Sequence, residues 1–197
     1  MVIMLIQIPK ARTSQPSGEI RRDSLARFFL GPLAGVANRR KFLTQFEVAR
    51  GRLRSQRQAY ALLIADVDHC KAINDSFGHQ AGNLALSLLS NRLDSCVRNG
   101  DSIGRIGGEK FAILLADCDP KAAAERAESI KDRVATAPLG LGDLQIPVTI
   151  SIGGVAIADP RCSFNDAYSQ ATRRLYRAKQ AGRNRVQMED PSVADED

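Results

Sequence analysis

Residues 102–116 read SIGRIGGEKFAILLA, two short apolar runs on either side of a Gly-Gly pair. Apolar runs bounded by glycine indicate strands, and two glycines between them predict a two-residue hairpin turn in which Gly107 and Gly108 take positive φ. The turn is followed by one carboxylate, Glu109, and then by Lys110. We therefore expect a β-hairpin with a charged pair at its tip. The alternative is a turn that only connects two strands.

A second stretch, residues 59–83, reads AYALLIADVDHCKAINDSFGHQAGN. Its continuous apolar run at 61–65 predicts a buried strand, and Asp66 and Asp68 follow that strand directly. Mg²⁺ takes one or two protein carboxylates and completes its coordination with water and substrate phosphates, so Asp66 and Glu109 together would be enough protein ligands. Either aspartate alone could instead cap a helix.

These stretches resemble the GGDEF family, the diguanylate cyclases and their degenerate relatives in bacterial cyclic di-GMP signalling. Four segments carry the likeness: N-R-R at 38–40, D-x-D-H-x-K-x-I-N-D-x-x-G-H-x-x-G at 66–82, R-x-x-D-x-x-x-R-x-G-G at 98–108 and L-Y-x-A-K-x-x-G-R-N at 175–184. Their spacing agrees across most of the chain, so we identify a GGDEF domain and treat its activity as a separate question.

The resemblance implies a reaction in which two GTP molecules, each held by one subunit of a homodimer, are joined into cyclic di-GMP. Two divalent metals, Mg²⁺ or Mn²⁺, stabilise the attacking and leaving oxygens. By position, the resemblance also implies a set of site residues. These are the metal ligands Asp66, Glu109 and the Val67 carbonyl, the triphosphate contacts Lys179 and Arg183, and the guanine contact Asn74.

The chain departs from the family pattern at Lys110, where the family has a second acidic residue after the metal glutamate. Replacing a charge of −1 by +1 at ~4 Å from a metal costs several kcal/mol at an effective dielectric constant near 20. A loss of ~4 kcal/mol from the transition state would slow the reaction by orders of magnitude. We therefore expect weak or lost cyclase activity. The alternative is that Lys110 turns outward and clamps a phosphate.

A second departure is Asn83, where the family has an aspartate after the glycine of G-H-x-x-G. A carboxylate accepts hydrogen bonds from both N1–H and the N2 amino group of guanine, whereas an amide offers one acceptor. Losing such a bidentate pair is worth roughly 1–3 kcal/mol of base discrimination, by analogy with groove readout. Selectivity for GTP should weaken. The alternative is that Asn83 caps the helix that carries Ala85, Leu88 and Leu89.

Arg98 and Asp101 keep the form of the family's inhibitory R-x-x-D site. An arginine fork matches O6 and N7 of guanine, and a nearby carboxylate can accept from N1–H and N2–H, so the pair is suited to one guanine of cyclic di-GMP. Arg105 or another surface arginine could hold a phosphate. The alternative is a solvated ion pair at a helix end.

The length of 197 residues and the 44% apolar composition favour one domain with tails. We expect a flexible lead at 1–22, the GGDEF domain at 23–188 and an acidic tail at 189–197. The first residues lack a basic leader, and no apolar stretch approaches ~20 residues, so we expect a cytoplasmic protein without a membrane partner. Four cysteines without pairing or metal-like spacing predict free thiols.

Charge is uneven along the chain. The net charge is +6, but residues 189–197 hold five acids and no base, which leaves 28 − 17 = +11 on the rest. Basic residues crowd into 50–57 and 173–185, which could attract nucleic acid. Solvated helix faces explain them better, because no aromatic residues alternate with the arginines to form a stacking platform.

Periodicity predicts an α/β fold with a mixed central sheet flanked by helices, and the resemblance implies the palm-like sheet of nucleotidyl cyclases and polymerases. Three helices are expected to carry apolar stripes, one starting near Phe42, one after Asp119-Pro120 and one at 163–182. Residues 146–158 predict a strand.

The leading hypothesis is a degenerate GGDEF domain that binds cyclic di-GMP at Arg98 and Asp101, or GTP in an impaired site, and regulates a partner protein. The runner-up is a working diguanylate cyclase that acts as a homodimer. A basic nucleic-acid-binding module is a third possibility, which charge permits and no motif supports.

Overall fold

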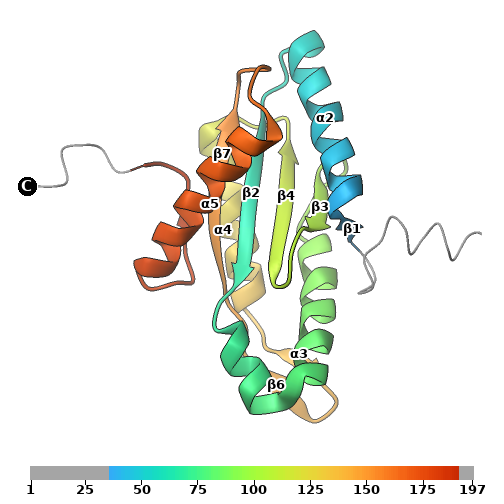
Figure 1. Ribbon diagram of the computed structural model, residues 1–197, viewed down its shortest axis with the longest axis vertical. Helices are drawn as coiled ribbons and strands as arrows, with labels where there is room; N and C mark the ends of the chain where they lie inside the picture. The colour runs from blue at the N-terminus through green and yellow to red at the C-terminus, as the bar shows by residue number, and fades with distance from the viewer. Residues whose placement is uncertain (1–35, 191–197) are drawn as a thin grey trace, which may run out of the picture.

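The computed structural model describes residues 36–190, which form a mixed six-stranded sheet in the order β1-β3-β4-β2-β7-β8 (Figure 1). The β1–β3 and β7–β8 pairs are parallel and the others are antiparallel. The strands are β1 (Ala37–Asn38), β2 (Tyr60–Val67), β3 (Ser102–Arg105), β4 (Lys110–Ala116), β7 (Ile150–Ile157) and β8 (Val186–Gln187). A separate two-stranded ribbon pairs β5 (Leu139–Leu141) with β6 (Leu144–Ile146).

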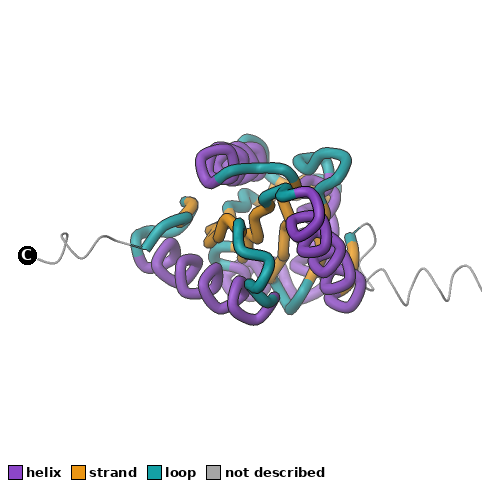
Figure 2. The backbone as a smooth tube through the Cα atoms, turned by 90° about the horizontal axis from the view of Figure 1, so that it is seen from above, coloured by secondary structure: helices purple, strands orange, loops and turns teal. Residues whose placement is uncertain are grey.

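Helices cover both faces of the sheet, as Figure 2 shows from above. The helices α2 (Arg39–Gln56) and α5 (Phe164–Gln180) lie on one face, and α3 (Cys70–Asp94) and α4 (Pro120–Ala135) lie on the other. The mixed α/β sandwich predicted from the sequence is therefore confirmed. Within the described residues, 36–190, no helix is long and apolar enough to cross a membrane.

The central strand β2 contributes side chains to the hydrophobic core on both faces of the sheet. All eight of its residues are buried, because β4 and β7 flank it and helices cover both of its faces. Side chains of successive residues point to opposite faces of a strand, so Leu62 and Ile64 pack under α2 and α5 while Leu63 and Ala65 pack under α3 and α4.

The expected helix signals are present. Asp119 caps α4 by accepting a hydrogen bond from the Ala122 amide at 2.7 Å. In α5, Ser163 and Asp166 form a reciprocal capping box, and Gly182 follows the last turn with a φ of 115°. The predicted apolar stripe of α4 is buried at Ala123, Ala127, Ile130 and Val134.

The hairpin tip differs from the two-residue turn predicted. The β3–β4 register ends at Arg105 opposite Phe111, and neither Gly107 nor Gly108 has positive φ. The Ile106 amide donates a hydrogen bond to the Lys110 carbonyl at 3.0 Å, which leaves Gly107, Gly108 and Glu109 in the turn. Arg105 holds the wider turn by donating hydrogen bonds to the Gly107 and Gly108 carbonyls.

The strand predicted at 146–158 is confirmed over Ile150–Ile157 as β7, but it begins later than predicted, and Ile146 belongs to β6. Pro147 and the two residues after it separate β6 from β7, since proline has no amide hydrogen for a sheet. The β5–β6 ribbon turns at Gly142, whose φ is 59°. The four cysteines are free thiols, as predicted.

Candidate nucleotide site

The end of β2, the β3–β4 tip and the end of α5 meet at one end of the sheet. An open cavity of about 510 Å³ lies there. It is lined by Val67, His69, Cys70, Lys71, Ala72, Asp75, Glu109, Lys179 and Arg183. Segments more than a hundred residues apart therefore place four of the predicted site residues, Val67, Glu109, Lys179 and Arg183, around one cavity.

Asp66 joins this group through a salt bridge. Its side chain is 3% exposed, and its Oδ1 pairs with the Lys179 ammonium group. Burial raises the pKa of Asp66 above its ordinary value, and the negative charge of Glu109 adds to the rise. Lys179 and Lys110 oppose it. The predicted metal ligand is thus already paired with a cation.

Lys110 stands directly beside this ion pair. Asp66 and Lys110 are opposite each other in the β2–β4 register, so both side chains lie on the same face of the sheet. The carboxylate of Asp66 therefore pairs with the Lys179 ammonium group, and the charge of Lys110 also acts on it without an ion pair within 4.0 Å. The lysine that replaces the second acidic residue of the family pattern therefore lies opposite the predicted metal ligand Asp66.

The donor set for a divalent metal is small. The two carboxylates and the Val67 carbonyl are oxygen donors, which Mg²⁺ prefers. Within the described part of the chain, no group of three or more His, Cys, Asp or Glu side chains could hold a metal. These residues fit a Mg²⁺ ion that brings phosphate oxygens and water with it, on condition that Lys179 moves off Asp66.

The expected guanine contacts lie on α3, which bends sharply at Gly78. Beyond the bend, Gly82 packs against Asn74, and a Cβ at Gly82 would lie 1.9 Å from the Asn74 Oδ1. Asn83 is exposed and lies inside α3, so the alternative that it caps a helix is wrong. Neither Asp66 nor Asp68 caps α3, whose N-cap residue is His69.

The R-x-x-D segment has a different geometry from a solvated ion pair. Asp101 accepts hydrogen bonds from the Arg98 amide at 2.7 Å and the Ala116 amide at 3.0 Å. Its ionic partner is Arg126 of α4, and the Asp101 side chain is 2% exposed. Sequence reasoning missed Arg126, because only packing brings α4 beside Asp101. Arg98 itself is exposed, and Arg105 lies at the other end of β3.

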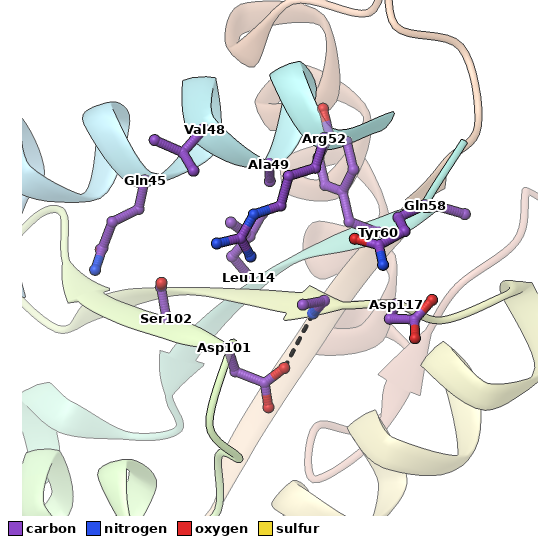
Figure 3. Close-up of a pocket in the computed structure, with 13 residues that line it drawn as sticks. Gln45, Val48, Ala49, Arg52, Gln58, Tyr60, Asp101, Ser102, Leu114 and Asp117 are labelled. Carbon is purple, nitrogen blue, oxygen red and sulfur yellow. Dashed lines mark hydrogen bonds between the residues drawn. The ribbon is translucent and has the colours of Figure 1, made fainter. Parts of the chain in front are cut away.

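A second cavity of about 270 Å³ lies next to Asp101, between α2 and the strands β3 and β4 (Figure 3). The guanidinium group of Arg52 reaches from α2 toward β3 in this cavity, and Ser102 and Asp117 also line it. Within residues 36–190, Arg52 forms no ion pair, so its charge is available to an anion. The sequence pattern had assigned this arginine only to a basic run.

Residues 29–185 match the family model described as diguanylate cyclase, GGDEF domain, and the chain belongs to that family. A probable diguanylate cyclase of Escherichia coli, DgcT, is 35% identical over 161 residues, which are 81% of this chain and 35% of that protein. The chain thus spans about a third of that relative's length.

Two solved structures show the same fold. The active GGEEF domain of a diguanylate cyclase from Vibrio cholerae has a TM-score of 0.73 and 31% identity, covering 80% of this chain and all of that one. The GGDEF domain of DgcB from Caulobacter crescentus, in complex with c-di-GMP, has a TM-score of 0.75 and 26% identity, covering 81% and 95%.

Proposed function

We propose that this chain is a degenerate GGDEF domain that binds guanine nucleotides and regulates a partner without condensing GTP. Cyclic di-GMP would bind beside Arg98, and GTP would bind in the cavity at Glu109. The observation that carries the proposal is the position of Lys110 directly opposite Asp66 in the β2–β4 register.

The electrostatic reason is the charge beside the metal position. The Vibrio cholerae relative is described as an active GGEEF domain, whereas this chain reads G-G-E-K-F at 107–111. An ammonium group in place of the second carboxylate opposes Mg²⁺ binding, and the Asp66–Lys179 ion pair must also break before a metal can bind.

A turnover assay tests the loss of catalysis. Purified protein is incubated with GTP and Mg²⁺ or Mn²⁺, and products are separated by chromatography. We expect no cyclic di-GMP above the level of Glu109→Ala, which removes a predicted metal ligand. Turnover by the wild type that Glu109→Ala abolishes would contradict the proposal.

Calorimetry with cyclic di-GMP tests the regulatory site. Arg98 is exposed and can offer its guanidinium fork to guanine, while Asp101 is held by Arg126 and by two amides and would have to exchange partners to take part. We expect Arg98→Ala to weaken binding at least tenfold, the loss of a bidentate contact. Equal affinities for the wild type and Arg98→Ala would exclude this site.

An active cyclase is the second candidate. The observation in its favour is that Val67, Glu109, Lys179 and Arg183 line one cavity with Asp66 beside them. It would require a homodimer, because each subunit holds one GTP, and it makes the opposite prediction in the turnover assay. The nucleic-acid candidate has less support, because Asp190 partly neutralises the basic run at 173–185 by pairing with three of its arginines.

A further inference from the structure

Asp68 lies one residue beyond β2 and is almost completely buried, with 3% of its surface exposed. Its Oδ1 accepts a hydrogen bond from the Ser151 hydroxyl at 2.7 Å. Its Oδ2 accepts from the Thr149 hydroxyl at 2.8 Å and from the Asn184 amide at 3.0 Å. Both carboxylate oxygens are therefore used by protein donors, which leaves Asp68 poorly placed to be a second metal ligand beside Asp66.

The Asn184 amide belongs to the turn that follows α5. In this turn Gly182, Arg183 and Asn184 all have positive φ, at 115°, 63° and 45°. Residues other than glycine rarely adopt a positive φ. This backbone conformation persists where neighbouring groups hold it in place. Two hydrogen bonds hold it here, from the Arg183 amide to the Ala178 carbonyl at 3.1 Å and from the Asn184 amide to Asp68.

Arg183 is the residue that this turn presents to the cavity. Within residues 36–190 its side chain forms no ion pair, and its backbone amide is bound to the Ala178 carbonyl. The anchor on the far side of Arg183 is the bond to Asp68, which is charge-assisted and shielded from water. The direction of the Arg183 guanidinium group therefore depends on a carboxylate that does not itself line the cavity.

We propose that Asp68 is a positioning residue, which holds the α5–β8 turn so that Arg183 contacts the phosphates of a bound nucleotide. This inference rests on the proposed GTP site. It assigns different roles to the two aspartates at the end of β2, because Asp66 pairs with Lys179 while Asp68 ties β2 to β7 and to the α5–β8 turn.

A double-mutant cycle tests this role by calorimetry, with GTP and guanosine as ligands in buffers with Mg²⁺ or with EDTA. We expect Asp68→Ala and Arg183→Ala each to weaken GTP binding about tenfold, as expected for a lost bond to a charged group. The double variant should bind GTP no more weakly than Arg183→Ala alone, because Asp68 acts through Arg183. Guanosine affinity should be unchanged in all variants.

Asp68→Asn provides the conservative comparison and replaces Asp68→Ala in the cycle if that variant fails to fold. An amide can turn its NH₂ group toward the Ser151 hydroxyl and keep an oxygen for the Asn184 amide, so this variant should retain most of the GTP affinity. Asp166→Asn, at the exposed cap of α5, is the matched control and should bind GTP like the wild type.

Three results would overturn the positioning role. Additive losses in the double variant would mean that Asp68 acts independently of Arg183. An equal loss of guanosine binding would mean a general loss of structure. A loss seen only with Mg²⁺ would make Asp68 a metal ligand. If the wild type binds no GTP, the proposed GTP site itself fails, and the positioning role fails with it.

Discussion

At the scale of single residues, some buried polar side chains in the part of the chain that the structure describes have hydrogen-bond partners, whereas Tyr60 has none. Asp68 and Asp101 are buried with both oxygens hydrogen-bonded. Tyr60 is also buried, with 1% of its surface exposed, but its hydroxyl oxygen has no hydrogen-bond partner among residues 36–190. Burial raises the pKa of Tyr60 to about 12, and the nearby Cys162 adds to the rise.

We expect Tyr60→Phe to be neutral or to raise the free energy of unfolding by about 1 kcal/mol, because it removes an unsatisfied buried group. Because the pKa of Tyr60 is raised, its ionisation does not lower the free energy of unfolding below about pH 10, and the free energy of unfolding falls as the pH rises from there through about 12. Alkaline unfolding followed by circular dichroism should therefore begin at higher pH in Tyr60→Phe. An earlier onset in this variant would contradict the prediction.

At the scale of elements, the bend in α3 folds the G-H-x-x-G segment back onto the first part of the helix. Gly78 has φ 83° and ψ 159°, a conformation that is nearly restricted to glycine. The bend lets the second part of the helix return so that Gly82 packs against Asn74. The glycine at the bend, and not a helix cap at Asn83, is what shapes the G-H-x-x-G segment.

We expect Gly78→Ala to lower the free energy of unfolding by about 1–3 kcal/mol through backbone strain. Apart from its neighbours along the chain, no atom of the part that the structure describes lies within 4 Å of a Cβ placed at Gly78, so crowding does not contribute. Gly51→Ala is the matched control, because it is equally uncrowded but lies within α2, where alanine should stabilise by about 0.5–1 kcal/mol. Equal effects of the two substitutions in urea unfolding would exclude the strain explanation.

At the scale of the whole molecule, the two candidate ligand regions lie at opposite ends of the β3–β4 pair. The cavity at Glu109 lies at the hairpin tip, whereas Asp101 lies just before β3 and accepts a hydrogen bond from the Ala116 amide at the end of β4. The Asp101–Arg126 ion pair joins this second end to α4. A ligand that takes Asp101 from Arg126 would therefore change how α4 is held against the sheet.

We expect Arg126→Ala to lower the free energy of unfolding by about 3 kcal/mol, because it leaves the charge of Asp101 buried without its ionic partner. The double variant Asp101→Asn with Arg126→Ala should recover part of that loss, since the uncompensated charge is gone. Urea unfolding of the single and double variants checks this. A double variant less stable than Arg126→Ala would contradict it.

Sequence reasoning succeeded where the signal was local. The run at 61–65, the stripe of α4 and its start at Asp119-Pro120 depend on neighbouring residues, and all of them lie where they were predicted. The family pattern also named four residues that line one cavity in the structure, Val67, Glu109, Lys179 and Arg183.

Sequence reasoning failed where distant pairing decides the structure. Asp101 finds Arg126 and Asp68 finds Asn184 only after helices and strands pack. These partners could not be found by spacing, because contacts between distant segments depend on the assembled fold.

The rate of cyclic di-GMP formation by Lys110→Glu, compared with the wild type, tests the central claim most directly. The substitution removes the ammonium group opposite Asp66 and restores a carboxylate. If the misplaced charge costs ~4 kcal/mol in the transition state, the rate should rise about a thousandfold. Glu109→Ala in the same background should abolish the gain. A Lys110→Glu rate equal to that of the wild type would contradict the claim that the charge of Lys110 prevents cyclic di-GMP formation.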